Sequence, residues 1–265
     1  MGKDKDKQDR PLRVVIFGGG PVLERGVKQF VCRLEAHPEI EFLGGFCQSP
    51  GQSFADVFRD LWKRRRFLAF PLLLADLGGR AKVYLVHPRQ ELQLKRNFNT
   101  VAARIYYVKD IHAPEVLESI QKLDPDLGLV YGSPILKPVL FDIPHCGTLG
   151  IHHGKVPEYR GKKTTFWAIY NREVSAGVTI QKINAGLDKG DIVKKGEVEI
   201  GRKSPSRVWE EIEALGLDLY IQAILELKHG TATFLPQAGQ KGILYRDPKP
   251  GQILAVWLRY FKGKS

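Results

Sequence analysis

The start of the chain constrains the fold most, because it reads as a strand, a glycine turn, a helix and a second strand. Residues 12–17 form an apolar, β-branched run that ends in Gly18-Gly19-Gly20-Pro21. Residues 26–34 place apolar side chains at helical spacing, and residues 40–46 read as the second strand. A strand–helix–strand unit implies parallel strands joined by a right-handed crossover.

The glycines before this helix have two interpretations. They permit a sharp turn and expose backbone N–H groups at a helix start, which suits an anion. However, the triplet does not match the G-x-G-x-x-G pattern, and turn chemistry alone also explains it. The sequence therefore does not require dinucleotide binding here.

The alternation of strands and helices resumes after residue 100. Strands are predicted at 104–108, 127–131, 146–151 and 178–183, and helices at 114–123 and 165–170. Ser204-Pro205 is typical of a helix start, and the apolar face that follows predicts a long helix. From Thr231 we expect loop and short strand, and then a docked helix over 253–264.

These patterns predict an α/β fold with a mostly parallel, twisted, Rossmann-like sheet flanked by helices. We expect a disordered leader at 1–10 and a catalytic domain at 11–233. A basic helical insertion is expected at about 54–99, and a small C-terminal extension at 234–265.

Composition narrows the class of protein. The 265 residues carry a net charge of +12, which can attract nucleic acid, acidic lipids or phosphorylated small molecules, or can be an unspecialised basic surface. No apolar run reaches the roughly 18 residues that span a bilayer. Three cysteines without paired spacing favour reduced thiols and a cytoplasmic location.

One segment carries polar residues where packing alone would not require them. It begins with Leu149-Gly150-Ile151-His152-His153 and contains Tyr159-Arg160-Gly161. It closes with Gly177-Val178-Thr179-Ile180 and then Ala185-Gly186-Leu187-Asp188-Lys189-Gly190-Asp191. A histidine at a strand end and a carboxylate in a glycine-flanked turn favour a catalytic pair. The plain alternative is a structural histidine and an aspartate that only stabilises its turn.

These two motifs resemble the folate-dependent formyltransferase family, whose members include glycinamide ribonucleotide transformylase, methionyl-tRNA formyltransferase and sugar N-formyltransferases. That family has an Asn-x-His strand end, a Pro-containing loop and a Leu-Asp-x-Gly turn. The resemblance covers roughly 12–233, except for 54–99. It implies a Rossmann-like formyltransferase fold, N10-formyltetrahydrofolate as the formyl donor, and His152 and Asp188 as the catalytic residues.

The resemblance also implies binding residues. The folate is expected to contact Tyr131, Gly132, Ile135, Leu136, Gly186 and Leu187. Tyr159, Arg160 and Gly161 are expected to bind substrate or to brace their loop. Tyr159-Arg160-Gly161 and Phe166-Trp167-Ala168 resemble the sugar-modifying branches more than the transfer-RNA enzyme.

The chain departs from the family at Gly150, which stands where the asparagine is expected. In the family the asparagine amide and the histidine imidazolium donate to the oxyanion of a tetrahedral intermediate, and the aspartate raises the histidine pKa. Three alternatives stay open. His153, Lys155 or Asn184 supplies the donor, a water fills the space, or the protein binds without efficient transfer.

We therefore expect formyl transfer from N10-formyltetrahydrofolate to a primary amine of a small metabolite, such as an amino sugar or a nucleotide-linked sugar, with no metal. The alternatives are hydrolysis of the formyl donor and a catalytically weakened folate-binding homologue. Transfer-RNA formylation ranks last because little chain follows Thr233. Nucleic acid is not an expected partner, whereas a homodimer and a peripheral membrane contact stay open.

Overall fold

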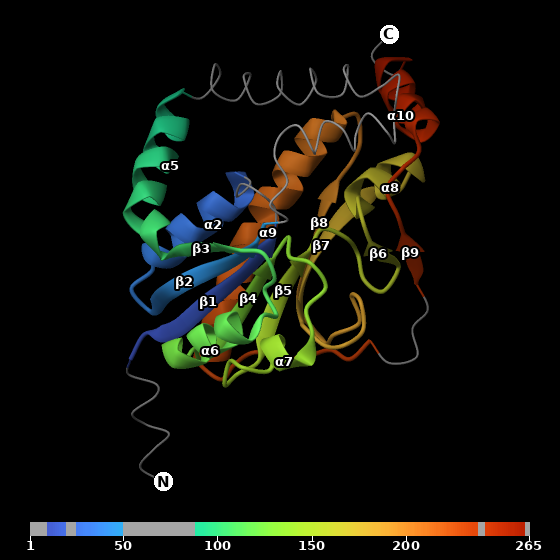
Figure 1. Ribbon diagram of the computed structural model, residues 1–265. Coiled ribbons are helices and arrows are strands. Elements are labelled where there is room, and N and C mark those ends of the chain that lie inside the picture. The colour runs from blue at the N-terminus through green and yellow to red at the C-terminus, as the bar shows by residue number, and fades with distance from the viewer. Residues whose placement is uncertain (1–9, 20–24, 50–87, 238–241, 263–265) are drawn as a thin grey trace.

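The computed structural model describes residues 10–19, 25–49, 88–237 and 242–262 (Figure 1). The strands are β1 (Leu12–Gly19), β2 (Ile40–Gln48), β3 (Ile105–Val108), β4 (Leu127–Tyr131), β5 (Thr148–His152), β6 (Tyr159–Gly161), β7 (Ser175–Lys182), β8 (Ile192–Glu199) and β9 (Ile243–Tyr245). The helices are α2 (Arg25–Glu35), α5 (Pro88–Val101), η1 (Ala102–Arg104, a 3-10 turn), α6 (Pro114–Leu123), α7 (Pro138–Phe141), α8 (Thr164–Tyr170), α9 (Pro205–Lys228) and α10 (Pro250–Lys262).

Among the described residues, seven strands form one sheet in the order β3-β2-β1-β4-β5-β7-β8. The first five of these strands run parallel, whereas β7 is antiparallel to both β5 and β8. The predicted strand–helix–strand unit is confirmed, because β1 pairs in parallel with β2 and α2 connects them. The α/β class and the mostly parallel sheet are confirmed as well.

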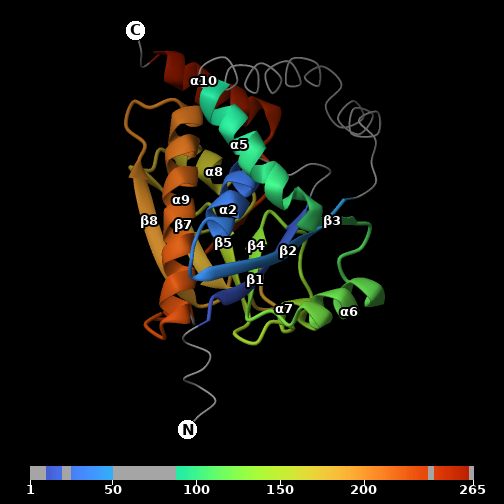
Figure 2. The same ribbon diagram turned by 90° about the vertical axis from the view of Figure 1, so that its left-hand side faces the viewer.

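Helices cover both faces of the sheet, as Figures 1 and 2 show. On one face, α2 and α9 bury Phe30, Leu34 and Tyr220 against β1, β2 and β4. On the other face, α6 and α7 bury Ile120 and Leu140 against the opposite side of β1. Alternate residues of a strand point to opposite faces, so β1 supplies apolar side chains to both layers.

The C-terminal helices agree with the sequence expectations. Helix α9 begins at Pro205, and the side chain of Ser204 accepts a hydrogen bond from the backbone N–H of Arg207. Helix α10 docks on α8, and the guanidinium of Arg259 donates to the carbonyl of Tyr170. The predicted long helix and the docked terminal helix are therefore confirmed.

Strands β8 and β6 were not predicted, and β9 was expected only as a short strand after Thr231. The sequence of β8 is half charged, and after the buried Ile192 and Val193 its residues alternate between partly buried and exposed. Strands β6 and β9 have three residues each and pair with each other in parallel, away from the large sheet. Strands this short leave almost no periodicity in a sequence.

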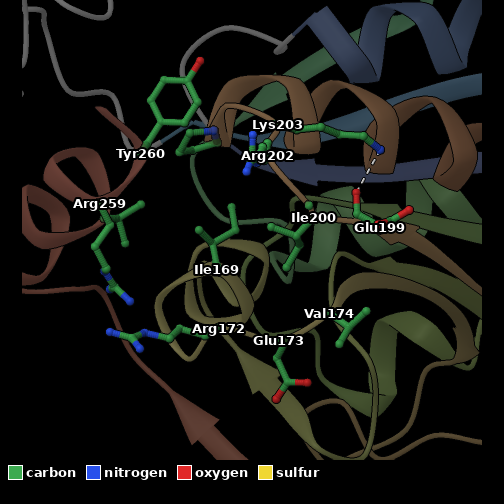
Figure 3. A pocket seen from close by; sticks show the side chains of 13 residues that line it. Ile169, Arg172, Glu173, Val174, Glu199, Ile200, Arg202, Lys203, Arg259 and Tyr260 are labelled. Atoms are coloured by element: carbon green, nitrogen blue, oxygen red, sulfur yellow. Dashed lines mark hydrogen bonds between the residues drawn. The ribbon is translucent and has the colours of Figure 1, made fainter. Parts of the chain in front are cut away.

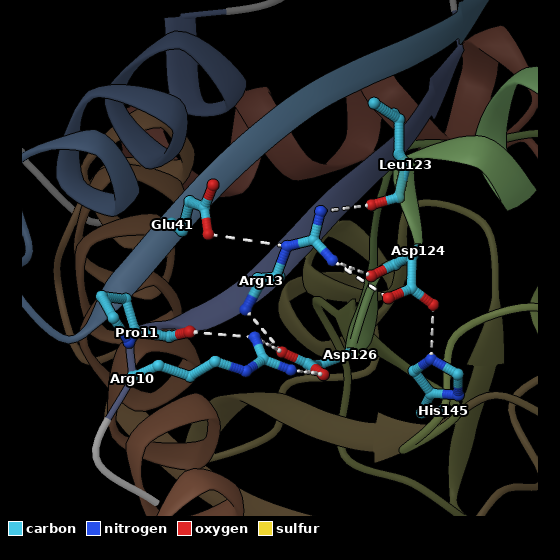
Figure 4. A network of polar contacts seen from close by, with 8 residues as sticks. All are labelled: Arg10, Pro11, Arg13, Glu41, Leu123, Asp124, Asp126 and His145. Atoms are coloured by element: carbon cyan, nitrogen blue, oxygen red, sulfur yellow. Dashed lines mark hydrogen bonds and ion pairs between the residues drawn. The ribbon is translucent and has the colours of Figure 1, made fainter. Parts of the chain in front are cut away.

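A polar network joins the beginnings of β1 and β4 (Figure 4). The guanidinium of Arg10 donates to both carboxylate oxygens of Asp126 at 2.8 Å, and the backbone N–H of Arg13 donates to the same carboxylate at 2.9 Å. Asp124 binds both Arg13 and His145. These contacts lie at the N-terminal ends of β1 and β4. The candidate site lies at the opposite end of the sheet, where these parallel strands end.

Some sequence expectations fall outside the described residues. These include residues 1–9 of the predicted leader, Gly20 and Pro21 of the glycine turn with its two interpretations, and residues 54–87 of the predicted insertion. The rest of the insertion, 88–99, lies within α5. Of the helices that the structure describes, none combines the length and the apolar character that crossing a membrane requires.

Candidate active site

A cavity of about 380 Å³ lies between the loop that follows β4, the end of β5 and the turn that follows β7. Most of the predicted site residues line it. The predicted residues in its wall are Gly132, Ile135, Leu136, His152, Gly161, Asn184, Gly186, Leu187 and Asp188. Segments far apart in the sequence therefore meet at one place.

His152 and Asp188 converge in this cavity. The Nδ1 atom of His152 lies 3.5 Å from Oδ1 of Asp188, and the two side chains are only 9% and 13% exposed. His152 reaches the site because it is the last residue of β5, and Asp188 reaches it from the turn between β7 and β8. The proximity that the two sequence motifs predicted is therefore present.

The loop after β5 fixes the His152 ring. Its Nε2 atom lies 2.8 Å from the backbone carbonyl oxygen of Tyr159. A carbonyl can only accept a hydrogen bond, so Nε2 carries a proton. Gly154 makes this contact possible, since a Cβ atom there would lie 2.6 Å from Nε2 of His152 and 2.7 Å from the Tyr159 oxygen. The neutral ring consequently has its lone pair on Nδ1, the nitrogen nearer Asp188.

Burial dominates the titration of His152. Desolvation lowers the pKa of His152 below the ordinary histidine value, whereas the Asp188 carboxylate and the Tyr159 carbonyl raise it and His153 lowers it further. Asp188 acts in the expected direction, but burial outweighs it. The environment of the protein without ligand therefore favours the neutral imidazole.

Backbone and side-chain donors hold Asp188. Its backbone adopts a positive φ of 51°, which aspartate tolerates better than most residues. The N–H of Gly161 donates to Oδ2 at 2.8 Å, and the side-chain amide of Gln181 donates to Oδ1 at 3.2 Å. Gln181 in turn accepts a hydrogen bond from Gln237, which follows α9.

The space beside Gly150 is filled by an apolar side chain. A Cβ atom at position 150 would lie only 2.6 Å from Cδ1 of Ile183 and 3.5 Å from Cβ of Val130. The Ile183 side chain thus occupies the place where a residue larger than glycine would begin. Gly150 also lines the cavity, so whether a water takes the place of the asparagine amide stays open.

The three expected substitute donors are differently placed. The Nε2 atom of His153 lies 2.7 Å from Glu213 of α9, outside the wall of this cavity. Lys155 donates to Ser175, also outside the wall. Asn184 does line the cavity, but its amide nitrogen donates to the backbone carbonyl of Lys189.

Tyr131 does not line the cavity either, although the resemblance places it in the folate wall. Its ring packs against Phe30, and its hydroxyl donates to Glu213. The residues that follow it, Gly132, Ile135 and Leu136, do line the cavity, and Ile135 is 77% exposed. Tyr131 is therefore skipped in the wall, whereas its neighbours Val130 and Gly132 contribute to it.

The Tyr159–Gly161 segment braces the site. The Tyr159 ring stacks on Tyr245 of β9 at 4.9 Å, and Arg160 donates to the carbonyl of Gly242. Of the three residues, only Gly161 lines the cavity, and its N–H binds Asp188. Of the two roles left open for Tyr159 and Arg160, these contacts match loop bracing.

Several cavity residues were missed from the sequence. They are Val130, Ser133, Pro134, Ile151, Lys162, Gln181, Lys182, Ile183, Ala185, Lys189 and Gly190, together with Gly150, which was noted only as a departure. A signal for Gln181 was present, because it stands seven residues before Asp188 on a strand predicted to be apolar. A polar residue inside such a strand indicates a partner in the interior.

A second cavity of about 510 Å³ lies between α8, the start of α9 and α10 (Figure 3). Its wall contains none of the predicted site residues. Two of its cationic side chains already have partners, since Arg259 donates to Tyr170 and Lys203 binds Glu211. This cavity is therefore not the candidate active site. In the described parts of the chain, no three His, Cys, Asp or Glu side chains gather as a metal site would require.

The comparisons with known proteins agree with this geometry. A family model described as formyl transferase matches residues 78–224, more than half of the 265-residue chain. The chain belongs to the formyl transferase family. Within the family, it is 32% identical over 162 residues to methionyl-tRNA formyltransferase of Ruminiclostridium cellulolyticum, covering 60% of this chain and 50% of that one.

Another methionyl-tRNA formyltransferase, from Francisella philomiragia, is 33% identical over 188 residues, covering 70% of this chain and 58% of that one. The chain thus spans only about half the length of these formyl transferase relatives. Their alignment supports the family and leaves the acceptor undetermined.

Solved structures support the formyl transferase fold. A sugar N-formyltransferase from Shewanella sp. superimposes with a TM-score of 0.57 at 15% identity, covering 94% of this chain and 87% of that one. A phosphoribosylglycinamide formyltransferase from Anaplasma phagocytophilum gives 0.58 at 13% identity, covering 90% and 100%. At these identities the likeness concerns the fold alone.

Proposed function

We propose that this chain transfers a formyl group from N10-formyltetrahydrofolate to a primary amine in the cavity that contains His152 and Asp188. The observation that carries the proposal is the meeting of these two buried side chains at 3.5 Å in a member of the formyl transferase family. Histidine and aspartate in this arrangement can accept and stabilise a proton.

The cavity suits a folate in its chemistry. The exposed apolar side chains of Ile135 and Leu187 can contact a flat heterocycle, and neighbouring backbone groups can hydrogen-bond its polar edge. Lys162, Lys182 and Lys189 also line the cavity and can attract the carboxylates of the folate glutamate. The residues that are present therefore fit the donor.

The bound folate supplies the formyl carbon, to which the amine nitrogen bonds as the bond to N10 breaks, and the proton lost by the amine ends on N10. In our proposal, the neutral His152 accepts this proton at Nδ1, because Tyr159 holds Nε2 in the protonated form. The Asp188 carboxylate then faces the resulting imidazolium and stabilises it. The products are a formamide and tetrahydrofolate.

For the acceptor, we propose a small metabolite amine such as an amino sugar or a nucleotide-linked sugar. The support is the Tyr159-Arg160-Gly161 motif, and a net charge of +12 that would attract a phosphorylated molecule. The sequence relatives named methionyl-tRNA formyltransferase make methionyl-tRNA the natural competitor in a test.

The test mixes the protein with N10-formyltetrahydrofolate and a panel of amines that includes amino sugars, nucleotide-linked amino sugars and methionyl-tRNA. We expect tetrahydrofolate to form with one small amine and His152→Ala to abolish it. Formate release without any amine would instead indicate hydrolysis of the donor. Folate binding with no turnover would indicate a binding homologue, and both outcomes contradict the transferase proposal.

A further inference from the structure

We propose that Gln181 and Gln237 are positioning residues of this site, in which Gln237 orients the amide of Gln181 and Gln181 holds the Asp188 carboxylate toward His152. The kinetic part of this inference rests on the proposed function. The hydrogen-bond chain itself can be tested without catalysis. Gln237 lies outside the residues that the family resemblance covers, and Gln181, although it lies within the second motif, was not among the predicted site residues.

The orientation of each amide follows from the chain of contacts. The side-chain nitrogen of Gln237 contacts the backbone carbonyl of Gly190, which can only accept a hydrogen bond. The same nitrogen lies 3.1 Å from the amide of Gln181, so the oxygen of Gln181 must face it. The nitrogen of Gln181 must then face Oδ1 of Asp188, at 3.2 Å.

This arrangement holds both oxygens of the carboxylate. Gln181 donates to Oδ1, the oxygen that also faces His152, and the backbone N–H of Gly161 donates to Oδ2 at 2.8 Å. Two donors on separate oxygens fix the carboxylate plane. Without Gln181, Oδ1 can turn away from His152, and misplacing a catalytic group by about 1 Å can cost on the order of a hundredfold in rate.

Burial makes the hydrogen bonds between these side-chain amides hard to replace. Gln181 is only 4% exposed, so water cannot readily replace a lost partner. Its position in β7 is directly opposite Gly150 of β5, and it shares a face with Thr179, the residue opposite His152. The side-chain amide on this face therefore comes from β7, whereas β5 has Gly150 at the paired position and His152 two residues later.

Gln237 brings the C-terminal extension into the site. It follows the segment after α9, in which Leu235 forms a two-way backbone bridge with Ile192. That bridge brings Gln237 close to Gly190 and Gln181. The extension therefore reaches Asp188 indirectly. Gln237 donates a hydrogen bond to Gln181, and Gln181 donates one to the Asp188 carboxylate.

The kinetic test uses Gln181→Met and Gln237→Met, because methionine has a similar length and makes no comparable hydrogen bond. The matched control is Gln121→Met, at an exposed position of α6. With the acceptor found above, we expect Gln181→Met to lower kcat by about tenfold to a hundredfold. The KM for the folate should stay near the wild-type value.

The double variant tests whether Gln237 acts through Gln181. If Gln237 acts only through Gln181, then Gln237→Met lowers kcat in the wild-type background and adds nothing in the Gln181→Met background. Additive losses, or a Gln181→Met variant with wild-type kcat, would overturn the inference. Thermal unfolding of all variants distinguishes a general loss of stability from a loss of positioning.

A second measurement does not depend on turnover. In the protein with labelled histidine, NMR follows the titration of His152, whose signal is identified by its loss in His152→Gln. We expect the midpoint to move to lower pH in Gln181→Met and in Gln237→Met, because Oδ1 of Asp188 then turns away from His152 and the carboxylate stabilises the imidazolium less. If the midpoint in Gln181→Met equals that of the wild type, the proposed role of Gln181 in holding Asp188 is contradicted, even if no amine is ever formylated.

Discussion

Gln181 and Gly150 are directly paired across the β5–β7 ladder, and the Gln181 amide donates to the Asp188 carboxylate at 3.2 Å. The strand that ends at His152 therefore carries no amide at the position where relatives are expected to have one, while the neighbouring strand does. Because cross-strand partners share a face, this pairing brings the Gln181 amide into the wall around His152 and Asp188.

The two central residues should be separately required for transfer. We expect His152→Ala and Asp188→Asn each to lower kcat by about a hundredfold to ten-thousandfold, because each removes a group that handles the amine proton. Asp142→Asn, at an exposed position after α7, is the matched control. Comparable losses in the control, or near-normal turnover in Asp188→Asn, would contradict the assignment.

Stability should depend on pH through His152. Burial lowers its pKa in the folded protein, so the unfolded chain binds more protons between the folded and the unfolded pKa. The stability that His152 contributes is therefore fully present above its unfolded pKa and is lost as pH falls through the folded pKa. Urea unfolding between pH 5 and 7.5 should show a steeper pH dependence for the wild type than for His152→Gln. Parallel curves would show that burial does not depress this pKa.

Packing beside Gly150 should be tight. In Gly150→Ala the new Cβ atom meets Cδ1 of Ile183 at 2.6 Å, so we expect a loss of about 1–3 kcal/mol in the free energy of unfolding. Ile183→Val removes that Cδ1 atom and should recover most of the loss in the double variant. Denaturant unfolding of the four proteins measures the coupling, and strictly additive effects would mean that the two residues do not compete for space.

The C-terminal extension should support the site through its aromatic contact. Tyr245 of β9 stacks on Tyr159, and β9 pairs with β6, whose Gly161 binds Asp188. Tyr245→Ala should lose about 0.5–1.5 kcal/mol of stacking, in addition to its buried area, and should lower kcat. Tyr245→Phe keeps the ring and should retain most of the activity. If Tyr245→Ala transfers formyl groups at the wild-type rate, β9 does not support the site.

Much of the fold was accessible from the sequence, because long apolar runs and helical stripes mark β1, α2, β4 and α9. Strand β8 was missed because it is half charged and only its first two residues are fully buried, so it lacks an apolar run. The short β6–β9 pair was missed because it depends on contacts between distant segments.

The candidate site was only partly predictable for a similar reason. His152 and Asp188 lie in local motifs, so their types and spacing could be read along the chain. By contrast, the partner of Asp188 on β7 and the filling of the Gly150 space by Ile183 depend on the pairing of β5 with β7. Tyr131 was assigned to the folate wall, yet its side chain turns to Phe30 and Glu213, because strand alternation sends it to the α9 face.

The most direct measurement follows the labelled carbon of [13C]formyl-N10-tetrahydrofolate in the presence of the purified protein and the amine panel. We expect the label to appear in a formamide of one small amine, together with an equal amount of tetrahydrofolate, and we expect Asp188→Asn to prevent this. Label that stays on the folate with every amine, or that appears only as formate, would contradict the account.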